Sequence, residues 1–201
     1  MNSNGGTDMN KPQILLIGDS IRMGYCETVK ADLAEKADVI FPNDNCRCTH
    51  YVLETLNGWV GLTDPAQVIA VHFNCGHWDA AHFGGDPDPL TPLDEYARNL
   101  RRILWRLHRH FPAAKVYFAT TTPMNPSRIP DGNPRTTGEI REYNRVGLAV
   151  MAEEGIPVND LFALTENWGE ETFRDACHFT DEANVQLGHA VSGFLTGQLG
   201  L

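Results

Sequence analysis

The chain has 201 residues, 42% of them hydrophobic and 21% charged, which is typical of a globular protein with a sizeable core. Its formal net charge of -10 argues against nucleic acid or an anionic membrane as a partner, because both need a basic surface. No segment approaches the run of about 20 apolar residues that a membrane-spanning helix needs. The length favours a single domain.

Residues 1–12 are polar and rich in Gly and Asn, and they lack the basic start and apolar stretch of a secretion signal. We expect them to be a disordered leader or a cloning remnant, and residues 13–201 to form the domain. The five cysteines are an odd number in a chain too large to need disulfides. Reduced thiols in a cytoplasmic protein are the better interpretation.

Short apolar runs alternate along the chain with segments of helical periodicity. The expected strands are 14–17, 38–41, 68–73, 115–120 and a weak one at 156–158. The expected helices follow the first strand, fill 93–107 behind Thr91 as N-cap and Pro92, run from 140 to about 155, and follow Thr180. The proline-rich segment 121–137 is expected to be a long surface loop. This alternation predicts a parallel sheet covered on both faces, with ligands bound at the carboxyl ends of its strands.

A serine stands at the tight turn that ends the first strand, in Gly18-Asp19-Ser20. Gly18 permits the sharp reversal, and Ser20 lies near the free N–H groups and the positive dipole of a helix start. A hydroxyl there suits a nucleophile, because an oxyanion formed on its substrate meets donors already in position. The simpler alternative is that Asp19 or Ser20 only caps the helix.

An aspartate and a histidine lie three residues apart near the C-terminus, in Asp175-Ala176-Cys177-His178. An imidazole is the usual base that activates a serine hydroxyl, and a carboxylate fixes the tautomer and orientation of that imidazole. Taken alone, the D-x-x-H spacing also fits two surface residues with no catalytic role.

Together, the two motifs resemble those of the SGNH (GDSL) hydrolase family, which are esterases with a flavodoxin-like fold. The Gly-Asp-Ser run of 18–20 matches the first block of the family, and Asp175 and His178 match the last. The resemblance spans about 14–195 and implies an α/β/α sandwich around a five-stranded parallel sheet. It also implies that Ser20 is the nucleophile, His178 the general base and Asp175 the residue that orients this base.

The middle blocks depart from the family pattern. The third block is usually G-x-N-D, whose Asn donates to the oxyanion, whereas segment 73–79 reads Phe-Asn-Cys-Gly-His-Trp-Asp and resembles a subgroup with N-x-G-x-x-D. The resemblance gives the oxyanion role to Asn74, with the closing of a turn as the alternative. The second block normally supplies a glycine N–H, but segment 45–48 contains no glycine. The main-chain N–H of Cys48 is therefore expected to complete an oxyanion hole with Ser20 and Asn74.

Other side chains near the expected site have competing interpretations. Arg22 and Arg47 are candidates either to bind an anionic substrate group or to be solvated charges, and Trp78 either to line the substrate pocket or to pack. A metal site is a further alternative, with five candidate ligands: Cys46, Cys48, His50, Cys75 and His77. Because zinc sites usually show C-x₂₋₄-C spacing rather than the C-x-C found here, we expect neither a metal nor an organic cofactor.

The sequence thus predicts a serine esterase that hydrolyses a small-molecule, short-acyl ester, for example an O-acetyl group on a carbohydrate, through an acyl-enzyme. The choice of substrate follows the resemblance. A lysophospholipase or thioesterase is an alternative, which the lack of long apolar lid segments disfavours. A flavodoxin-like module that binds a nucleotide or flavin without chemistry is another, although the first turn lacks a glycine-rich phosphate loop. The oligomeric state stays open.

Overall fold

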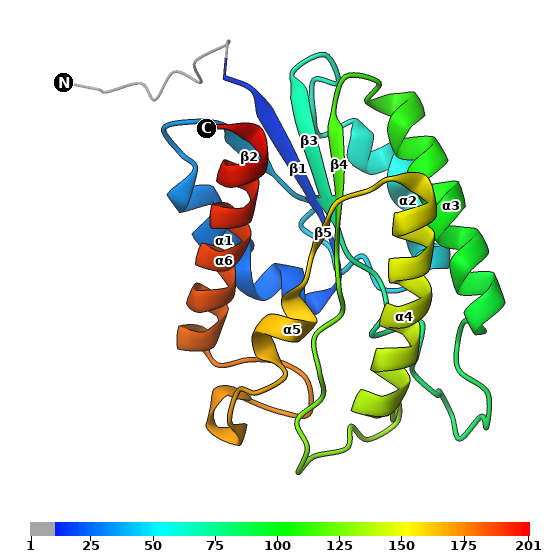
Figure 1. The fold of residues 1–201 in the computed structure, drawn as a ribbon. Helices are drawn as coiled ribbons and strands as arrows, with labels where there is room; N and C mark the ends of the chain where they lie inside the picture. Colours follow the sequence, from blue (N-terminus) through cyan, green and yellow to red (C-terminus); the bar gives the residue numbers. More distant parts are fainter. Residues whose placement is uncertain (1–10) are drawn as a thin grey trace.

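Five parallel strands form one sheet in the computed structural model, which describes residues 11–201 (Figure 1). The strands are β1 (Gln13–Ile17), β2 (Asp38–Ile40), β3 (Val68–Phe73), β4 (Lys115–Ala119) and β5 (Val158–Asn159). Their order in the sheet is β2-β1-β3-β4-β5, which is the order of the flavodoxin-like fold. The predicted fold class is confirmed, and β5 begins two residues later than expected.

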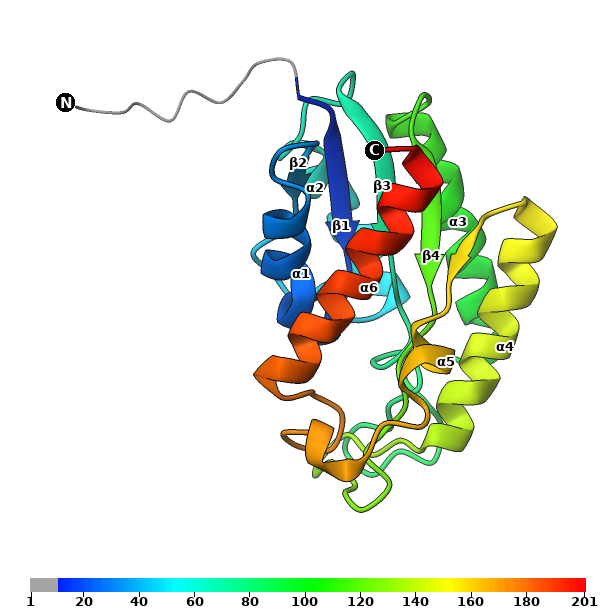
Figure 2. The same ribbon diagram turned by 60° about the vertical axis from the view of Figure 1, so that its left-hand side comes forward.

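Helices cover both faces of this sheet (Figures 1 and 2). On one face, α1 (Ser20–Asp32) packs against α6 (Asp181–Leu199). On the other, α3 (Leu93–His110) packs between α2 (Thr49–Val60) and α4 (Thr137–Glu154). The short α5 (Leu161–Thr165) and a 3-10 turn (Glu170–Thr172) connect β5 to α6. The result is the expected three-layer sandwich, and no helix within residues 11–201 combines the length and apolarity needed to cross a bilayer.

Strand β1 is buried on both faces and divides its side chains between two apolar clusters. Leu15 and Ile17 join the cluster under α2, α3 and α4, whereas Ile14 and Leu16 join the cluster under α1 and α6. All four are fully buried. A strand covered on both sides needs an unbroken apolar run rather than an alternating one, and the sequence of β1 supplies it.

The expected leader, 1–12, falls largely outside the described residues, which begin at Lys11. Pro12 is already part of the fold, because its carbonyl accepts a hydrogen bond of 2.9 Å from the N–H of Asp38 at the start of β2. The described fold therefore includes Pro12, which the prediction had assigned to the leader.

Helix α2 is absent from the expected elements. It begins at Thr49, whose N–H and hydroxyl donate to the buried carboxylate of Asp79 at 3.0 and 2.6 Å. Its buried stripe includes Val52, Leu56 and Trp59, spaced three and four residues apart. The helix start is thus stabilised by a carboxylate thirty residues away, and no local capping residue marks it in the sequence.

Two further expectations were wrong in detail. The N-cap of α3 is Pro92 rather than Thr91, which is fully buried. The proline-rich segment after β4 is only in part a surface loop, because residues 121–125 are buried. The buried backbone there has partners: the N–H and the carbonyl of Thr121 exchange two 2.8 Å hydrogen bonds with the side chain of Asn144.

Candidate active site

Ser20, His178 and Asp175 meet at the carboxyl edge of the sheet. Ser20 is the first residue of α1, and the other two lie in the loop before α6. The Ser20 hydroxyl oxygen lies 2.7 Å from Nε2 of His178, and Nδ1 of the same ring lies 2.8 Å from Oδ2 of Asp175. A continuous hydrogen-bonded chain therefore joins the hydroxyl to the carboxylate.

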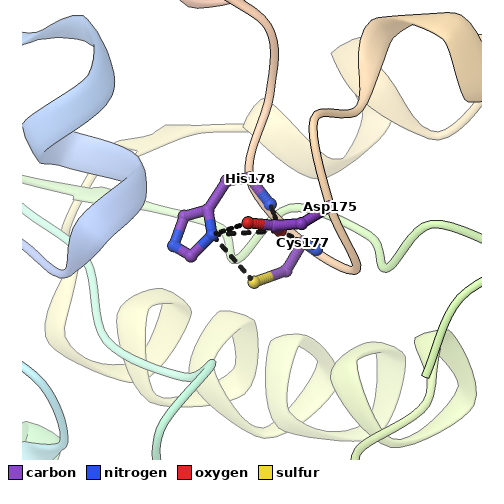
Figure 3. Close-up of side chains that lie close together, drawn as sticks. All are labelled: Asp175, Cys177 and His178. Carbon is purple, nitrogen blue, oxygen red and sulfur yellow. Dashed lines mark hydrogen bonds and ion pairs between the residues drawn. The ribbon is translucent and has the colours of Figure 1, made fainter. Parts of the chain in front are cut away.

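The loop before α6 is fixed by its own aspartate. Oδ1 of Asp175 accepts the N–H groups of Cys177 and His178 at 3.0 and 2.8 Å, which folds the backbone into an Asx turn (Figure 3). The N–H of Arg174 donates to the carbonyl of His178 at 2.8 Å and closes the loop. One carboxylate thus shapes the turn and orients the imidazole.

The electrostatics of this loop favour an ionic pair. Partial burial opposes ionisation of Asp175, but the N–H groups of Cys177 and His178 and the imidazole lower its pKa to about 2. The sulfur of Cys177, 3.8 Å from Nδ1, and then the Asp175 carboxylate raise the pKa of His178 to about 9 against partial burial. Both shifts favour the charged forms of Asp175 and His178.

The serine turn is held by Asp19 and leaves the hydroxyl of Ser20 available. Asp19 is fully buried and caps α1, since its Oδ1 accepts the N–H of Ile21 at 3.0 Å. The N–H of Ser20 belongs to the first helical turn, where intrahelical partners are lacking, and within residues 11–201 it donates to no acceptor. Asp19 therefore caps the helix while the hydroxyl of Ser20 stays available, so the two interpretations of this turn are compatible.

Asn74 follows β3 and packs against the same turn. It is only 5% exposed, and a Cβ on Gly18 would lie 2.0 Å from its Oδ1, so this position needs glycine. Burial raises the pKa of Asp19, and the N–H of Ile21 and the amide of Asn74 offset this only in part. The structure therefore brings Asn74 to the serine turn, as expected.

Ser20 and His178 lie between two hollows. The first is a cavity of about 270 Å³, lined beside them by Asn45, Trp78, Arg135 and Cys177. The second, of about 380 Å³, is lined by Met23, Gly24, Arg174, Phe179, Asp181 and Asn184. Both hollows therefore open onto the Ser20 hydroxyl and the His178 ring.

The structure does not bring Cys48 or Arg22 into the cavity beside Ser20. Cys48 is the N-cap residue of α2 and lines a neighbouring hollow that does not include Ser20. Arg22 is 1% exposed, and its guanidinium donates to the carbonyls of Gly18 and Asp44. Its guanidinium links the end of β1 and the loop after β2 to α1, and it is too buried to contact a substrate.

Arg47 and Trp78 lie together at the surface. The guanidinium of Arg47 lies 4.7 Å from the ring centre of Tyr51 and 5.9 Å from that of Trp78, which stacks on Phe83. Trp78 lines both the cavity beside Ser20 and the neighbouring hollow of about 370 Å³, whereas Arg47 lines only the latter. Of the three expected binding residues, Trp78 is the one beside the serine.

The metal ligands considered from the sequence do not gather at one point. Within residues 11–201, the group of possible ligand atoms that does gather is that of Asp175, Cys177 and His178, within 4.8 Å of one another (Figure 3). The carboxylate and Nδ1 of this group bond to each other, and the guanidinium of Arg135, 3.3 Å from the sulfur, opposes a cation. The donor set is therefore better suited to orienting His178 than to holding a metal.

Asn45, Arg135 and Cys177 line the cavity but were not among the expected site residues. Cys177 stands inside the D-x-x-H motif, so the spacing alone placed it there. Arg135 lies in a proline-rich segment read as surface loop, and nothing local in the sequence marks it as buried.

Comparison with known proteins identifies the family of the chain. Residues 16–185 match the model of the GDSL-like lipase/acylhydrolase family. The chain belongs to this family. As a GDSL hydrolase it is an ester-hydrolysing enzyme, as the sequence predicted, and not a non-catalytic binding module.

Curated relatives of this GDSL hydrolase cover most of its length. It is 26% identical over 207 residues to a GDSL esterase/lipase of Arabidopsis thaliana, covering 90% of this chain and 84% of the relative. It is 30% identical over 179 residues to the isoamyl acetate-hydrolyzing esterase 1 homolog of Rattus norvegicus, which covers 80% of this chain and 71% of the relative. Among solved structures it resembles a lipase/acylhydrolase from Enterococcus faecalis, with a TM-score of 0.72 and 25% identity. The match covers 93% of this chain and 96% of the other. An acetyl xylan esterase shares the fold, with a TM-score of 0.69 and 18% identity. The match covers 91% of this chain and 99% of the other.

Proposed function

We propose that this enzyme hydrolyses short-acyl carboxylic esters through an acyl-enzyme formed on Ser20. The observation that carries the proposal is the chain of contacts from the Ser20 hydroxyl through His178 to Asp175, at 2.7 and 2.8 Å. These distances lie within the reach that proton transfer between nucleophile, base and orienting group requires.

In the proposed reaction, the Ser20 oxygen attacks the ester carbonyl carbon while Nε2 of His178 takes the hydroxyl proton. Asp175 keeps the other ring proton on Nδ1 and stabilises the imidazolium that forms. The tetrahedral intermediate collapses, the alcohol leaves with the proton from Nε2, and the acyl group stays on Ser20. Water, deprotonated by the same Nε2, then releases the acid and restores the serine.

The proposed oxyanion donors are the N–H of Ser20 and the side-chain amide of Asn74. The N–H of Ser20 supports this role because it points out of the first turn of α1 without a protein acceptor within residues 11–201. Asn74 supports it because it packs on Gly18 of the same turn. Asn45, which lines the cavity, replaces Cys48 as the candidate for a third donor.

The cavity beside Ser20 favours a small, partly polar group. Its volume of about 270 Å³ lies just below the roughly 300–1,000 Å³ of pockets that enclose drug-sized ligands, and polar side chains such as Asn45 and Arg135 line it beside Trp78. The rat relative and the acetyl xylan esterase are both named for acetyl esters. We therefore favour an acetyl-sized group, with an O-acetylated carbohydrate as one substrate of this kind, over a lysophospholipid or long-chain thioester.

The test is a series of p-nitrophenyl esters of increasing acyl length, with Ser20→Ala as the control. We expect kcat/KM to be highest for the shortest acyl groups, and the Ser20→Ala enzyme to be inactive while melting normally. Equal or rising rates with long acyl chains would overturn the substrate preference, and an active Ser20→Ala enzyme would overturn the mechanism.

We further propose that the protein works in the cytoplasm as a single hydrolase domain over residues 12–201, one residue longer than the predicted 13–201. All five cysteines are free and buried, as is expected in a reducing compartment. Fractionation of the source cells with an antibody against the domain tests this location, and recovery from the extracellular medium would contradict it.

A further inference from the structure

Arg135 is a buried cation that faces the catalytic cavity. It lies two residues before α4 and is 6% exposed, yet it lines the same cavity of about 270 Å³ as Ser20 and His178. Arginine is rarely buried to this degree unless it is paired with an anion. Arg22 is also buried without a carboxylate, but Arg135 is the one that lines the cavity, so the partners of Arg135 bear on what the cavity binds.

The hydrogen-bond partners of the Arg135 guanidinium include no carboxylate. Nε donates to Nδ1 of His77 at 3.2 Å, Nη1 to the carbonyl of Asn133 at 3.0 Å, and Nη2 lies 3.3 Å from the sulfur of Cys177. Burial, and next the charge of Arg135, lower the pKa of His77 well below 6.5, so its ring is a neutral acceptor.

Part of the guanidinium remains available for a ligand. Of its five N–H groups, the three described contacts use one on each nitrogen. One N–H on each terminal nitrogen is left without an acceptor within residues 11–201. Two N–H groups on adjacent nitrogens are what a carboxylate binds with both of its oxygens.

The neighbouring carboxylates do not neutralise this charge directly. No Asp or Glu oxygen within residues 11–201 lies within 4 Å of Arg135. Asp19 interacts with it only at longer range, and Asp175 is occupied by His178 and by its own turn. A buried charge without an ion pair is costly, and an anion in the cavity removes that cost.

We propose that Arg135 binds a carboxylate carried by the ester substrate, so that the enzyme prefers carboxylated short esters to neutral ones of the same length. The inference rests on the proposed function for the cleavage step and adds the substrate class. The carboxylate can belong to the acyl part, as in a half-ester of a dicarboxylic acid, or to the alcohol part. Both place the same anion against Arg135.

The experiment compares matched esters on the wild-type enzyme. The acyl arm sets mono-p-nitrophenyl succinate against p-nitrophenyl butyrate, and the alcohol arm sets 4-carboxyphenyl acetate against phenyl acetate. In one arm, we expect kcat/KM to favour the carboxylated ester by about 10-fold or more, mainly through a lower KM. The arm that shows the preference identifies the part that carries the carboxylate.

Variants then assign the preference to Arg135. Arg135→Gln should remove it by raising KM for the carboxylated ester about 10-fold, and should change the neutral ester far less. Arg135→Lys should retain part of the preference, because it keeps the charge but not the paired N–H groups. Arg109→Gln is the control, since it makes the same charge change at an exposed position in the last turn of α3.

A merely structural Arg135 gives a different result: the Gln variant would lose kcat on neutral and carboxylated esters alike, and the proposal would be wrong. If the Gln variant fails to fold, inhibition of the wild-type enzyme tests the proposal instead. Succinate or 4-hydroxybenzoate should inhibit neutral-ester turnover competitively, and their matched neutral amides should not. Turnover of neutral esters with no preference in either arm would overturn this inference alone, whereas no ester turnover at all would overturn the proposed function.

Discussion

The sulfur of Cys177 lies 3.8 Å from Nδ1 of His178, the ring nitrogen that also bonds to Asp175 at 2.8 Å. Cys177, which lies inside the D-x-x-H motif, therefore contacts the same ring nitrogen as Asp175. Together, the Cys177 sulfur first and the Asp175 carboxylate next, they raise the pKa of His178 to about 9. This contact has a direct consequence for the pH dependence of the reaction.

We expect kcat/KM to rise with pH and to reach half its maximum well above pH 6.5. The base must be neutral to take the serine proton, and its raised pKa means that the proton leaves only as pH climbs toward about 9. Cys177→Ala should move the midpoint down toward 6.5. Cys26→Ala, which removes a buried thiol of α1 away from the site, should leave it unchanged. An identical midpoint in the Cys177→Ala enzyme would show that the sulfur does not tune the base.

Asp175 and His178 should act as a unit. His178→Ala removes the base, so the further change Asp175→Asn should cost little more activity than the single His178→Ala change. Single-turnover rates of the two single variants and the double variant measure this coupling. Losses that multiply across the pair would mean that Asp175 acts on the reaction without His178.

Asn74→Ala should lower kcat by about 10²–10³-fold and change KM little, because an oxyanion donor acts mainly on the transition state. Asn45→Ala provides the comparison, since Asn45 lines the cavity and is the candidate third donor. Steady-state kinetics show how much each asparagine contributes to kcat, and melting curves show that each variant folds. An unchanged kcat for Asn74→Ala would remove it from the oxyanion hole.

Arg22→Met should destabilise the fold without changing substrate preference. Arg22 is buried and donates to the carbonyls of Gly18 and Asp44, so its loss leaves the half-buried Asp44 carbonyl without this donor at a cost of about 1–3 kcal/mol, whereas the Gly18 carbonyl keeps the N–H of Cys46. Urea unfolding measures the loss, and the exposed Arg47→Met is the control, expected within about 0.5 kcal/mol of wild type. Equal stability of the two variants would argue against the structural role.

Those parts of the fold that rest on local patterns could be predicted from the sequence. The apolar run of β1 needs no distant information, since a strand covered on both faces must be apolar throughout. The two motifs that supply Ser20, Asp175 and His178 lie at strand and helix ends, so the parallel topology alone brings them to one edge.

The parts that depend on distant partners could not be predicted. Helix α2 begins where Asp79 accepts from Thr49, and neither residue marks a helix start in its own neighbourhood. Arg135 is read as a surface charge among prolines until the fold places it against His77 and Cys177. Arg22 was misread for the same reason, because its acceptors are backbone carbonyls that the sequence does not display.

The central claim is that Ser20 carries the acyl group, and covalent trapping tests it most directly. The enzyme is treated with a fluorophosphonate ester, which reacts with an activated serine, and the modified residue is located by peptide mass spectrometry. We predict one adduct per chain, on Ser20, and no adduct on the Ser20→Ala enzyme treated in parallel. An adduct on any other residue of the wild-type enzyme, or an equal adduct on the Ser20→Ala enzyme, would contradict the account.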